Sequence, residues 1–401
     1  MSDHVQAVEN NIERRLRTPI ATDWQPSLGL RLAARNLAHD RVRFGVTIIG
    51  VTFSVILMSL QAALLIGFAA TSSQLVDRAA GDIWIVPKGT RNVDQSGDIM
   101  TSRRYQALAS SGVAAVEQMI VKFLPWKRPD GGIEVVIVIG VDPAHPAVAP
   151  WNFSVGSLDS LKQPDGIVID SLYAKKLGVT RVGESIEING HRTRISGITS
   201  GIRAFTQSPY VFASLNTARK LADLGEDRTT YLVVRAQPGA DISEVSERLR
   251  GRFPDVDVWR AVAFSWRTRE YWLLTTGAGA ALVIAAILGL VVGVVITAQT
   301  LYAATVERLQ EYATLRAMGA SKLYVHRIIL TQALMAATLG YTIGISLSFA
   351  AIHFARDGTA AFLLPWHFVL ALAIATAAMC TAGAVISIRR VLRIDPAMVF
   401  K

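Results

Sequence analysis

The sequence predicts a membrane α-helical protein with four transmembrane helices and a large α+β extracytoplasmic domain of two lobes, inserted between the first and second helices. Hydrophobic residues make up 51% of the 401 residues. They gather in four runs without a charged side chain, each reaching the roughly 20 residues that a bilayer crossing needs. One uninterrupted segment of mixed polarity, residues 71–270, separates the first run from the second.

The four apolar runs give the predicted spans. We place the first at residues 44–70, the second within 271–306, the third at 328–354 and the fourth at 366–388. The second run is too long for one crossing at about 1.5 Å per residue, so we expect its end to extend as helix into the cytoplasm.

Basic residues orient these spans. Arginine and lysine gather before the first span (1–43), between the second and third spans (307–327) and in the tail (389–401). With four spans these segments share one side of the membrane, which the positive-inside rule assigns to the cytoplasm. The net charge of +10 follows from this distribution, and no nucleic-acid-binding motif accompanies it. We therefore expect a multi-pass protein of the bacterial inner membrane, with both termini cytoplasmic, in contact with lipid and not with nucleic acid.

The cytoplasmic N-terminus, residues 1–43, contains an amphipathic stretch from Leu28 to Arg43. A basic amphipathic helix directly before a span can lie on the membrane surface. It can equally be an extension of the first span, and the sequence leaves both interpretations open.

The inserted segment alternates strand-like and helix-like patterns. Asn189-Gly190, between two alternating segments, predicts a hairpin turn. We expect residues 71–149 and 230–270 to form an α/β lobe near the membrane, and residues 150–229 to form a β-rich lobe beyond it. The predicted strands are 83–86, 134–141, 166–169, 185–188 and 231–235, and the predicted helices are 102–110, 172–177, 216–224 and 242–251.

Several kinds of chemistry lack their sequence signals. The spans contain no Asp, Glu, Lys or Arg, which argues against ion-coupled transport. We find no metal-ligand spacing and no nucleophile elbow, so we expect no bound cofactor and no catalytic residues. Without a Walker A motif, any ATP and Mg²⁺ must be bound by another polypeptide. The single cysteine, Cys380, lies in the fourth span and is expected to be a packing residue.

Residues 307–327 form a charged connection between the second and third spans. Gly319 is suited to ending a helix, and Ser321 is suited to capping the next one. Such a segment can fit a cleft on a soluble ATPase, or it can be a solvated connector. The residue pattern alone does not decide between these two.

This connection resembles the signature loop of the MacB/FtsX-type ABC transporter permeases. The matching positions are Glu311, Leu315, Arg316, Ala317, Gly319 and Ala320. The tail Arg393–Ala397 resembles the closing motif of that superfamily. Within it, Phe53–Gln61 and Ile139–Pro143 are most similar to the DevC branch.

The resemblance implies a permease subunit of an export or mechanotransmission complex, which relays ATP-driven movement to its periplasmic domain. It also implies four partners: an ABC ATPase, a second permease copy in a homodimer, a HlyD-like periplasmic adaptor and an outer-membrane channel. A membrane-anchored extracytoplasmic sensor or regulator without transport is the alternative. The residues that would contact the ATPase are Glu307, Arg308, Gln310, Glu311, Leu315, Arg316, Ala317, Gly319, Ala320 and Ser321.

Two glycine pairs predict close helix packing. Gly289 and Gly293 lie four residues apart in the second span, and Gly340 and Gly344 do so in the third. Small residues at this spacing let two helix backbones approach in a membrane. The sequence leaves open whether each pair packs within the chain or at a dimer contact.

Overall fold

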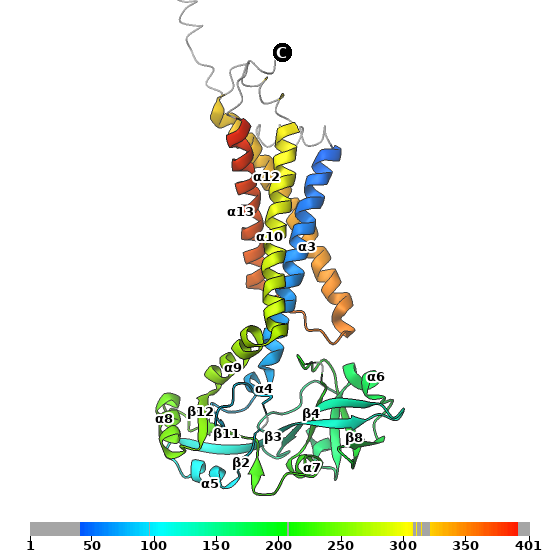
Figure 1. Cartoon of the computed structure of the whole chain (residues 1–401), viewed down its shortest axis with the longest axis vertical. Helices are drawn as coiled ribbons and strands as arrows, with labels where there is room; N and C mark the ends of the chain where they lie inside the picture. The colour runs from blue at the N-terminus through cyan, green and yellow to red at the C-terminus, as the bar shows by residue number, and fades with distance from the viewer. Residues whose placement is uncertain are drawn as a thin grey trace, which may run out of the picture. The chain divides into compact units, whose positions relative to one another are not determined.

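The computed structural model of the chain describes residues 41–95, 97–206, 208–307, 310, 314 and 321–391. It contains four long helices and a sheet domain inserted between the first and the second of them (Figure 1). The chain divides into two compact units. Unit 1 comprises residues 1–57, 290–346 and 370–401, and unit 2 comprises residues 58–289 and 347–369. Each long helix contributes one end to each unit, and the inserted domain belongs to unit 2.

The four long helices confirm the predicted transmembrane helices. They are α3 (Arg41–Ser72), α10 (Gly277–Glu307), α12 (Lys322–Phe354) and α13 (Trp366–Val391). The second departs most from its predicted range, because it begins at Gly277 and not at Tyr271. The stretches long and apolar enough to cross a membrane are Phe44–Ser72, Gly277–Thr300, His326–Phe354 and Trp366–Val385.

An interruption of helical structure precedes α10. Helix α9 (Ala261–Glu270) runs into a π-helix (Tyr271–Thr275), and the backbone is then extended at Thr276. The Thr276 hydroxyl accepts a hydrogen bond from the Gly279 N–H at 3.1 Å and so caps the first turn of α10. A Cβ atom on Gly279 would overlap the carbonyl of Trp272. The prediction missed this break because apolar composition is the same on both sides of it.

In unit 1 the first helix packs on the third through glycines. A Cβ atom at Gly340 would lie 2.6 Å from Cγ1 of Val51, and one at Gly344 would lie 2.8 Å from Cβ of Val55. Thr52 donates a hydrogen bond to the Gly340 carbonyl at 3.3 Å. The missing side chains let the backbones approach, so this glycine pair packs within the chain.

The first helix packs on the second through small polar residues. Thr297 donates a hydrogen bond to Ser54 at 3.3 Å, and Ser54 donates to the Gly50 carbonyl at 2.9 Å. Gly50 faces Thr300, whose methyl group would lie 2.7 Å from an added Cβ atom. Hydroxyl pairs of this kind satisfy polar groups inside lipid and contribute modestly, about 0.6 kcal/mol each.

One face of α10 is buried and the rest is exposed. Gly289, Gly293 and Thr297 are all buried, and their spacing of four residues places them on one side of the helix. On the other sides, Ile284 is 57% exposed and Leu288 is 56% exposed.

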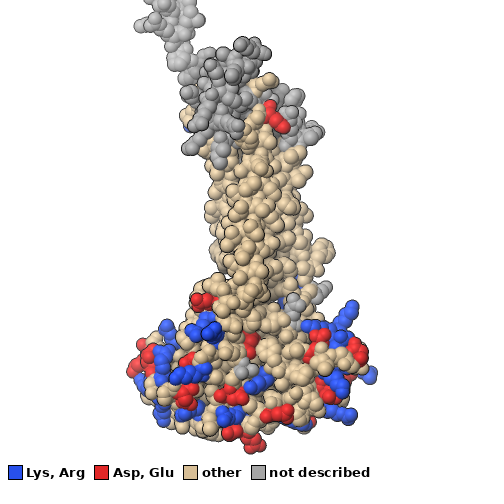
Figure 2. Space-filling model, viewed as in Figure 1, with Lys and Arg blue, Asp and Glu red and all other residues tan. Residues whose placement is uncertain are grey.

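The helices carry almost no charged side chain in Figure 2, whereas charged residues cover the inserted domain.

A ten-stranded mixed sheet forms the core of the inserted domain. Its order is β12-β1-β11-β3-β4-β9-β6-β8-β5, and β7 pairs with both β3 and β8. The β4·β9 and β6·β8 pairs are parallel, and the other pairs are antiparallel. The strands are β1 (Ile83–Pro87), β3 (Val113–Lys127), β4 (Ile133–Val141), β5 (Phe153–Val155), β6 (Gly166–Asp170), β7 (Ser185–Ile188), β8 (His191–Thr199), β9 (Tyr210–Ser214), β11 (Tyr231–Ala236) and β12 (Val256–Arg260).

Short helices cover this sheet. Gly140 lets α7 lie close to β4, because a Cβ atom there would overlap Ala218. A separate small ribbon pairs β2 (Ile99–Met100) with β10 (Arg228–Thr229). The helices are α4 (Gln74–Asp77), α5 (Ser102–Leu108), α6 (Ala174–Leu177), α7 (Leu215–Leu221) and α8 (Ile242–Arg252), with 3-10 turns at Leu158–Lys162 and Ser171–Tyr173.

Each predicted strand and helix of the inserted domain is present, with ends shifted by a few residues. The predicted hairpin joins β7 to β8, with Asn189 at φ +49° and Gly190 at φ +80°. The long strand β3 was missed, because its sequence has no sustained alternation and contains Pro125. The strands β5, β9 and β12 were missed as well.

The strands of the two predicted lobes form one sheet. The lobes meet where β4 pairs with β9, with Ile137 opposite Tyr210 at one end and Val141 opposite Ser214 at the other. One hydrophobic core also includes residues from both ranges, among them Trp84 and Phe212. The continuous pairing follows from the length of β3, which contacts β11, β4 and β7.

We expect Gly340→Val to destabilise the helices, because the new side chain collides with Val51 on α3. Overpacking of this kind costs about 1–3 kcal/mol. Thermal unfolding of the purified protein in detergent measures the loss. Gly45→Val is the matched control, since nothing lies within 4 Å of an added Cβ atom there. Equal loss in both variants would contradict the packing role of Gly340.

Candidate functional site

The predicted ATPase-coupling segment lies between α10 and α12. Glu307 is the last residue of α10, and Gln310 is exposed. The Ser321 hydroxyl accepts a hydrogen bond from the Tyr324 N–H at 3.2 Å, which confirms its predicted role as the cap of α12. The other predicted coupling residues, Arg308, Glu311, Leu315, Arg316, Ala317, Gly319 and Ala320, lie outside the described residues.

The inserted domain is attached to the helix ends of unit 2 at a site that we call the junction, formed by residues 63–77, 203–205, 261–276 and 355–363. Asp77 is its most connected side chain. Its carboxylate pairs with Arg269 at 2.6 Å and accepts hydrogen bonds from Ser265 at 2.5 Å and Ser73 at 2.7 Å. Arg269 also donates to the Ser73 hydroxyl at 2.7 Å. These bonds tie the chain leaving α3 to α9, which leads into α10.

The loop between α12 and α13 is held by Arg203. This loop contains a 3-10 turn, Ala355–Asp357. The Arg203 guanidinium donates hydrogen bonds to the carbonyls of Gly358, at 3.2 Å, and of Arg356. Gln74 of α4 in turn donates to the Arg203 carbonyl. One arginine therefore connects the inserted domain to a second pair of long helices.

Arg203 belongs to the range 150–229, which we expected to lie beyond the other lobe. Instead, the loop between β8 and β9 returns to the helix ends. Phe205 in this loop packs edge-on against Trp272 with 4.3 Å between ring centroids, and against Phe68 at 5.7 Å. Aromatic pairs of this geometry add to the energy of burial. No local sequence pattern predicts this return, because it depends on where β8 ends in the sheet.

The loop after the 3-10 turn also lies directly on the first helix. The Leu363 N–H donates to the Ala63 carbonyl at 3.0 Å. A Cβ atom on Gly67 would overlap the carbonyl of Ala361. A glycine at this position of α3 is therefore required for the close approach.

A buried carboxyl group lies beside the junction. Asp94 is 5% exposed and sits in a loop that Tyr231 holds by donating to the carbonyls of Val93 and Gln95. Among the described residues, neither carboxylate oxygen of Asp94 has a hydrogen-bond partner, and neither does the indole nitrogen of Trp272. Burial raises the pKa of Asp94 to about 7, and the nearby Trp272 indole only partly opposes this shift.

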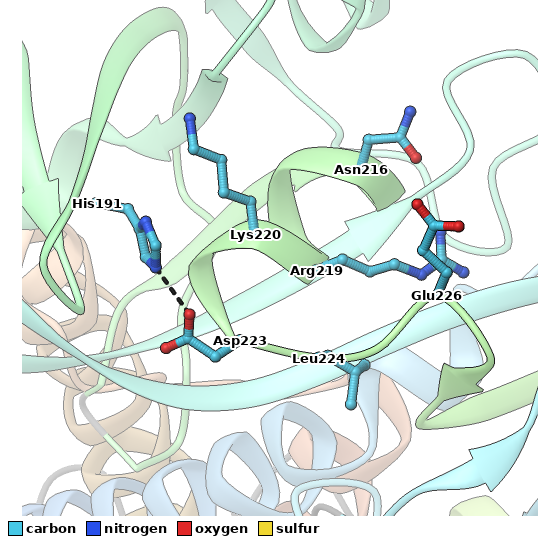
Figure 3. A pocket seen from close by; sticks show the side chains of 7 residues that line it. All are labelled: His191, Asn216, Arg219, Lys220, Asp223, Leu224 and Glu226. Atoms are coloured by element: carbon cyan, nitrogen blue, oxygen red, sulfur yellow. Dashed lines mark hydrogen bonds and ion pairs between the residues drawn. The ribbon is translucent and has the colours of Figure 1, made fainter.

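A polar surface pocket lies beside α7 (Figure 3), and its volume is about 680 Å³. His191 pairs with Asp223 at 3.0 Å, Lys220 pairs with Asp165 at 2.9 Å, and Arg219 donates to Gln118 at 2.6 Å. These contacts hold the β7–β8 turn and β3 against α7. Within the described part of the chain, no cluster of His, Cys, Asp or Glu could hold a metal ion.

Comparison with known protein families identifies two matches along the chain. The model of the MacB-like periplasmic core domain matches residues 44–252. The model of the FtsX-like permease C-terminal domain matches residues 283–396. Membership of the DevC branch stays a prediction, because neither match distinguishes the branches.

Similar proteins include two from Mycobacterium tuberculosis, in strains CDC 1551 and H37Rv, each named as an ABC transporter permease. Each is 23% identical over 376 residues, which covers 92% of this chain and 98% of the relative. Among solved structures, the periplasmic region of MacB from Actinobacillus actinomycetemcomitans is 13% identical with a TM-score of 0.37, covering 47% of this chain and 92% of that one. The extracellular domain of the transporter YknZ from Gram-positive bacteria is 12% identical with a TM-score of 0.33, covering 45% and 99%.

We expect Asp94→Asn to change how stability depends on pH. The folded state holds the Asp94 proton more tightly than the unfolded state, in which the pKa of the Asp94 carboxyl group is near the ordinary 3.8. The wild type therefore loses stability as the pH rises from about 4 to about 7, on the order of 4 kcal/mol in all. Asp94→Asn removes this loss, so its melting temperature should exceed that of the wild type most at pH 8.

Asp227→Asn is the matched control, since Asp227 is exposed. Thermal unfolding between pH 4 and pH 8 should follow the wild type in this variant. If Asp94→Asn left the dependence of melting temperature on pH unchanged, the raised pKa of Asp94 would be contradicted.

Proposed function

Since this chain belongs to the MacB/FtsX-like family of ABC transporter permeases, we propose that it relays ATP-driven movement from a separate ATPase to its inserted domain. The junction is the observation that supports this proposal most directly. Three of its connections, at Asp77, Arg203 and Phe205, link one domain to all the helix ends that unit 2 contributes.

The connections at the junction are suited to transmitting force. Asp77 accepts bonds from three side chains, so the ends of α3 and α9 cannot separate without breaking several short contacts at once. Arg203 joins the loop between α12 and α13 to the same domain. A change in helix spacing would therefore change the position of these attachments on the sheet.

The family implies an ATPase partner, and we place its docking surface at residues 307–321. In this proposal ATP and Mg²⁺ are bound by that partner, and the docking segment and both termini lie in the cytoplasm of a bacterial inner membrane. A second permease copy completes a homodimer. A HlyD-like adaptor and an outer-membrane channel would receive the movement, and the complex would act in export or mechanotransmission.

We expect Glu311→Lys and Gly319→Pro to abolish copurification of the cognate ATPase. The first reverses a charge at the proposed contact, and the second breaks the backbone where a helix is expected to end. Like-charge contacts cost several kcal/mol, so affinity should fall at least about tenfold. Glu226→Lys, the same charge reversal on the inserted domain, is the control. If the ATPase copurifies equally with all variants, the docking segment is misassigned.

We expect Asp77→Ala to uncouple the inserted domain while the ATPase still binds and hydrolyses ATP. Hydrogen exchange of α4 and α9 should change on ATP addition in the wild-type complex and much less in the variant, because the bonds to Ser73, Ser265 and Arg269 are lost.

Glu244→Ala is the control, since it removes a comparable pair with Arg248 on α8. A wild-type complex whose inserted domain does not respond to ATP would favour the alternative, a membrane-anchored sensor without transport.

A further inference from the structure

A cavity of about 540 Å³ opens at the junction, entirely within unit 2. Four segments line it: residues 64–71 of α3, residues 278–285 of α10, residues 203–205 of the inserted domain and residues 359–361 of the loop before α13. Its volume falls in the range of about 300–1,000 Å³ that small-molecule sites occupy. Arg203 and Phe205, which connect the inserted domain to the helix ends, also line this space.

The lining is mostly apolar. Helix α10 presents Ala278, Ala281 and Ala285, whose short side chains leave room for an occupant. Leu64 and Phe68 of α3 line the cavity as well. The hydroxyl of Thr71 donates to the Gly67 carbonyl of its own helix at 2.8 Å, so its hydrogen is already used. The cavity therefore suits a hydrocarbon chain.

The cavity reaches from the end of the spans into their apolar part. Leu64 lies eight residues before Ser72, the last residue of its candidate span, and Ala285 lies eight residues after Gly277, the first residue of its own candidate span. At 1.5 Å per residue, eight residues correspond to about 12 Å of depth. Trp272, which packs against Phe205, is of the type found at membrane surfaces.

Arg203 supplies the charge at this site. Among the described residues that line the cavity it is the one charged side chain, and no carboxylate accompanies it. Its guanidinium is held by the carbonyls of Gly358 and Arg356, which use two of its five N–H donors. The remaining donors are available to an anion, and arginine is well suited to a phosphate.

We propose that this cavity holds one acyl chain of an anionic phospholipid from the adjacent leaflet, with the lipid phosphate at Arg203. The apolar lining at span depth selects a lipid chain, and the lone arginine selects a negative headgroup. Burial of each methylene group favours the chain. The lipid fills the space between the helices and the inserted domain. This assignment does not depend on the ATPase.

A photoactivatable phosphatidylglycerol with a diazirine on its acyl chain tests the assignment. The full-length protein is placed in phosphatidylcholine nanodiscs containing this probe, and labelled peptides are identified by mass spectrometry. We expect labelling of residues 64–71 and 278–285 in the wild type. Ala285→Phe fills the cavity and should reduce this labelling about tenfold, the effect of overpacking at a binding site.

Ile284→Phe is the matched control, because Ile284 is next to Ala285 in the chain but its side chain is 57% exposed and does not line the cavity. Ala281→Phe, one turn before Ala285, is a second variant that fills the cavity. Thermal unfolding like that of the wild type shows whether each variant is folded. Equal labelling of the wild type, Ala285→Phe and Ala281→Phe would overturn the proposal. So would labelling confined to the outer face of α10 at Ile284 and Leu288.

Competition experiments test the headgroup. Unlabelled phosphatidylglycerol should displace the probe better than phosphatidylcholine, and Arg203→Gln should remove this preference. Free glycerol phosphate should not compete, because it lacks the chain. Equal displacement by the two lipids in the wild type, or displacement by glycerol phosphate alone, would overturn the assignment.

Discussion

The carboxylate of Asp77 connects the two backbone segments through which the inserted domain joins the first and second helices. Asp77 follows α3 within five residues, and its partners Arg269 and Ser265 precede the π-helix that leads to α10. Because its two oxygens accept bonds from three side chains, the arrangement has little freedom to slide. A single exposed ion pair contributes little to stability, so the significance of this one lies in its geometry.

Glycines and a threonine cap set the paths of the helices on either side of this connection. Gly67 admits the loop before α13, and Gly279 with Thr276 permits the turn from α9 into α10. In unit 1, Gly340 and Gly344 bring α12 against α3. These glycines let the helix backbones approach closely. On α10, Ala278, Ala281 and Ala285 leave room for the cavity next to Arg203.

Much of the architecture was predictable because it depends on local composition. Hydropathy located the four helices, and the hairpin at Asn189-Gly190 was predictable because its turn requires positive φ at both residues. The resemblance of residues 311–320 to permeases anticipated the family. By contrast, the single sheet was not predicted, since β3 lacks alternation and its pairing with β7 and β11 is made by residues far away in the sequence.

The sequence by itself determined that this is a four-span permease with one large insertion, because the spans follow from unbroken apolar length and the family from a short contiguous motif. Only the tertiary structure decided which residues join the insertion to the helices. Asp77 and Arg269 are 192 residues apart, and Arg203 and Gly358 are 155 apart. No periodicity or local motif reports such contacts, since they depend on where the sheet returns the chain to the helices. The raised pKa of Asp94 depends on tertiary packing as well, because burial of the carboxyl group causes it.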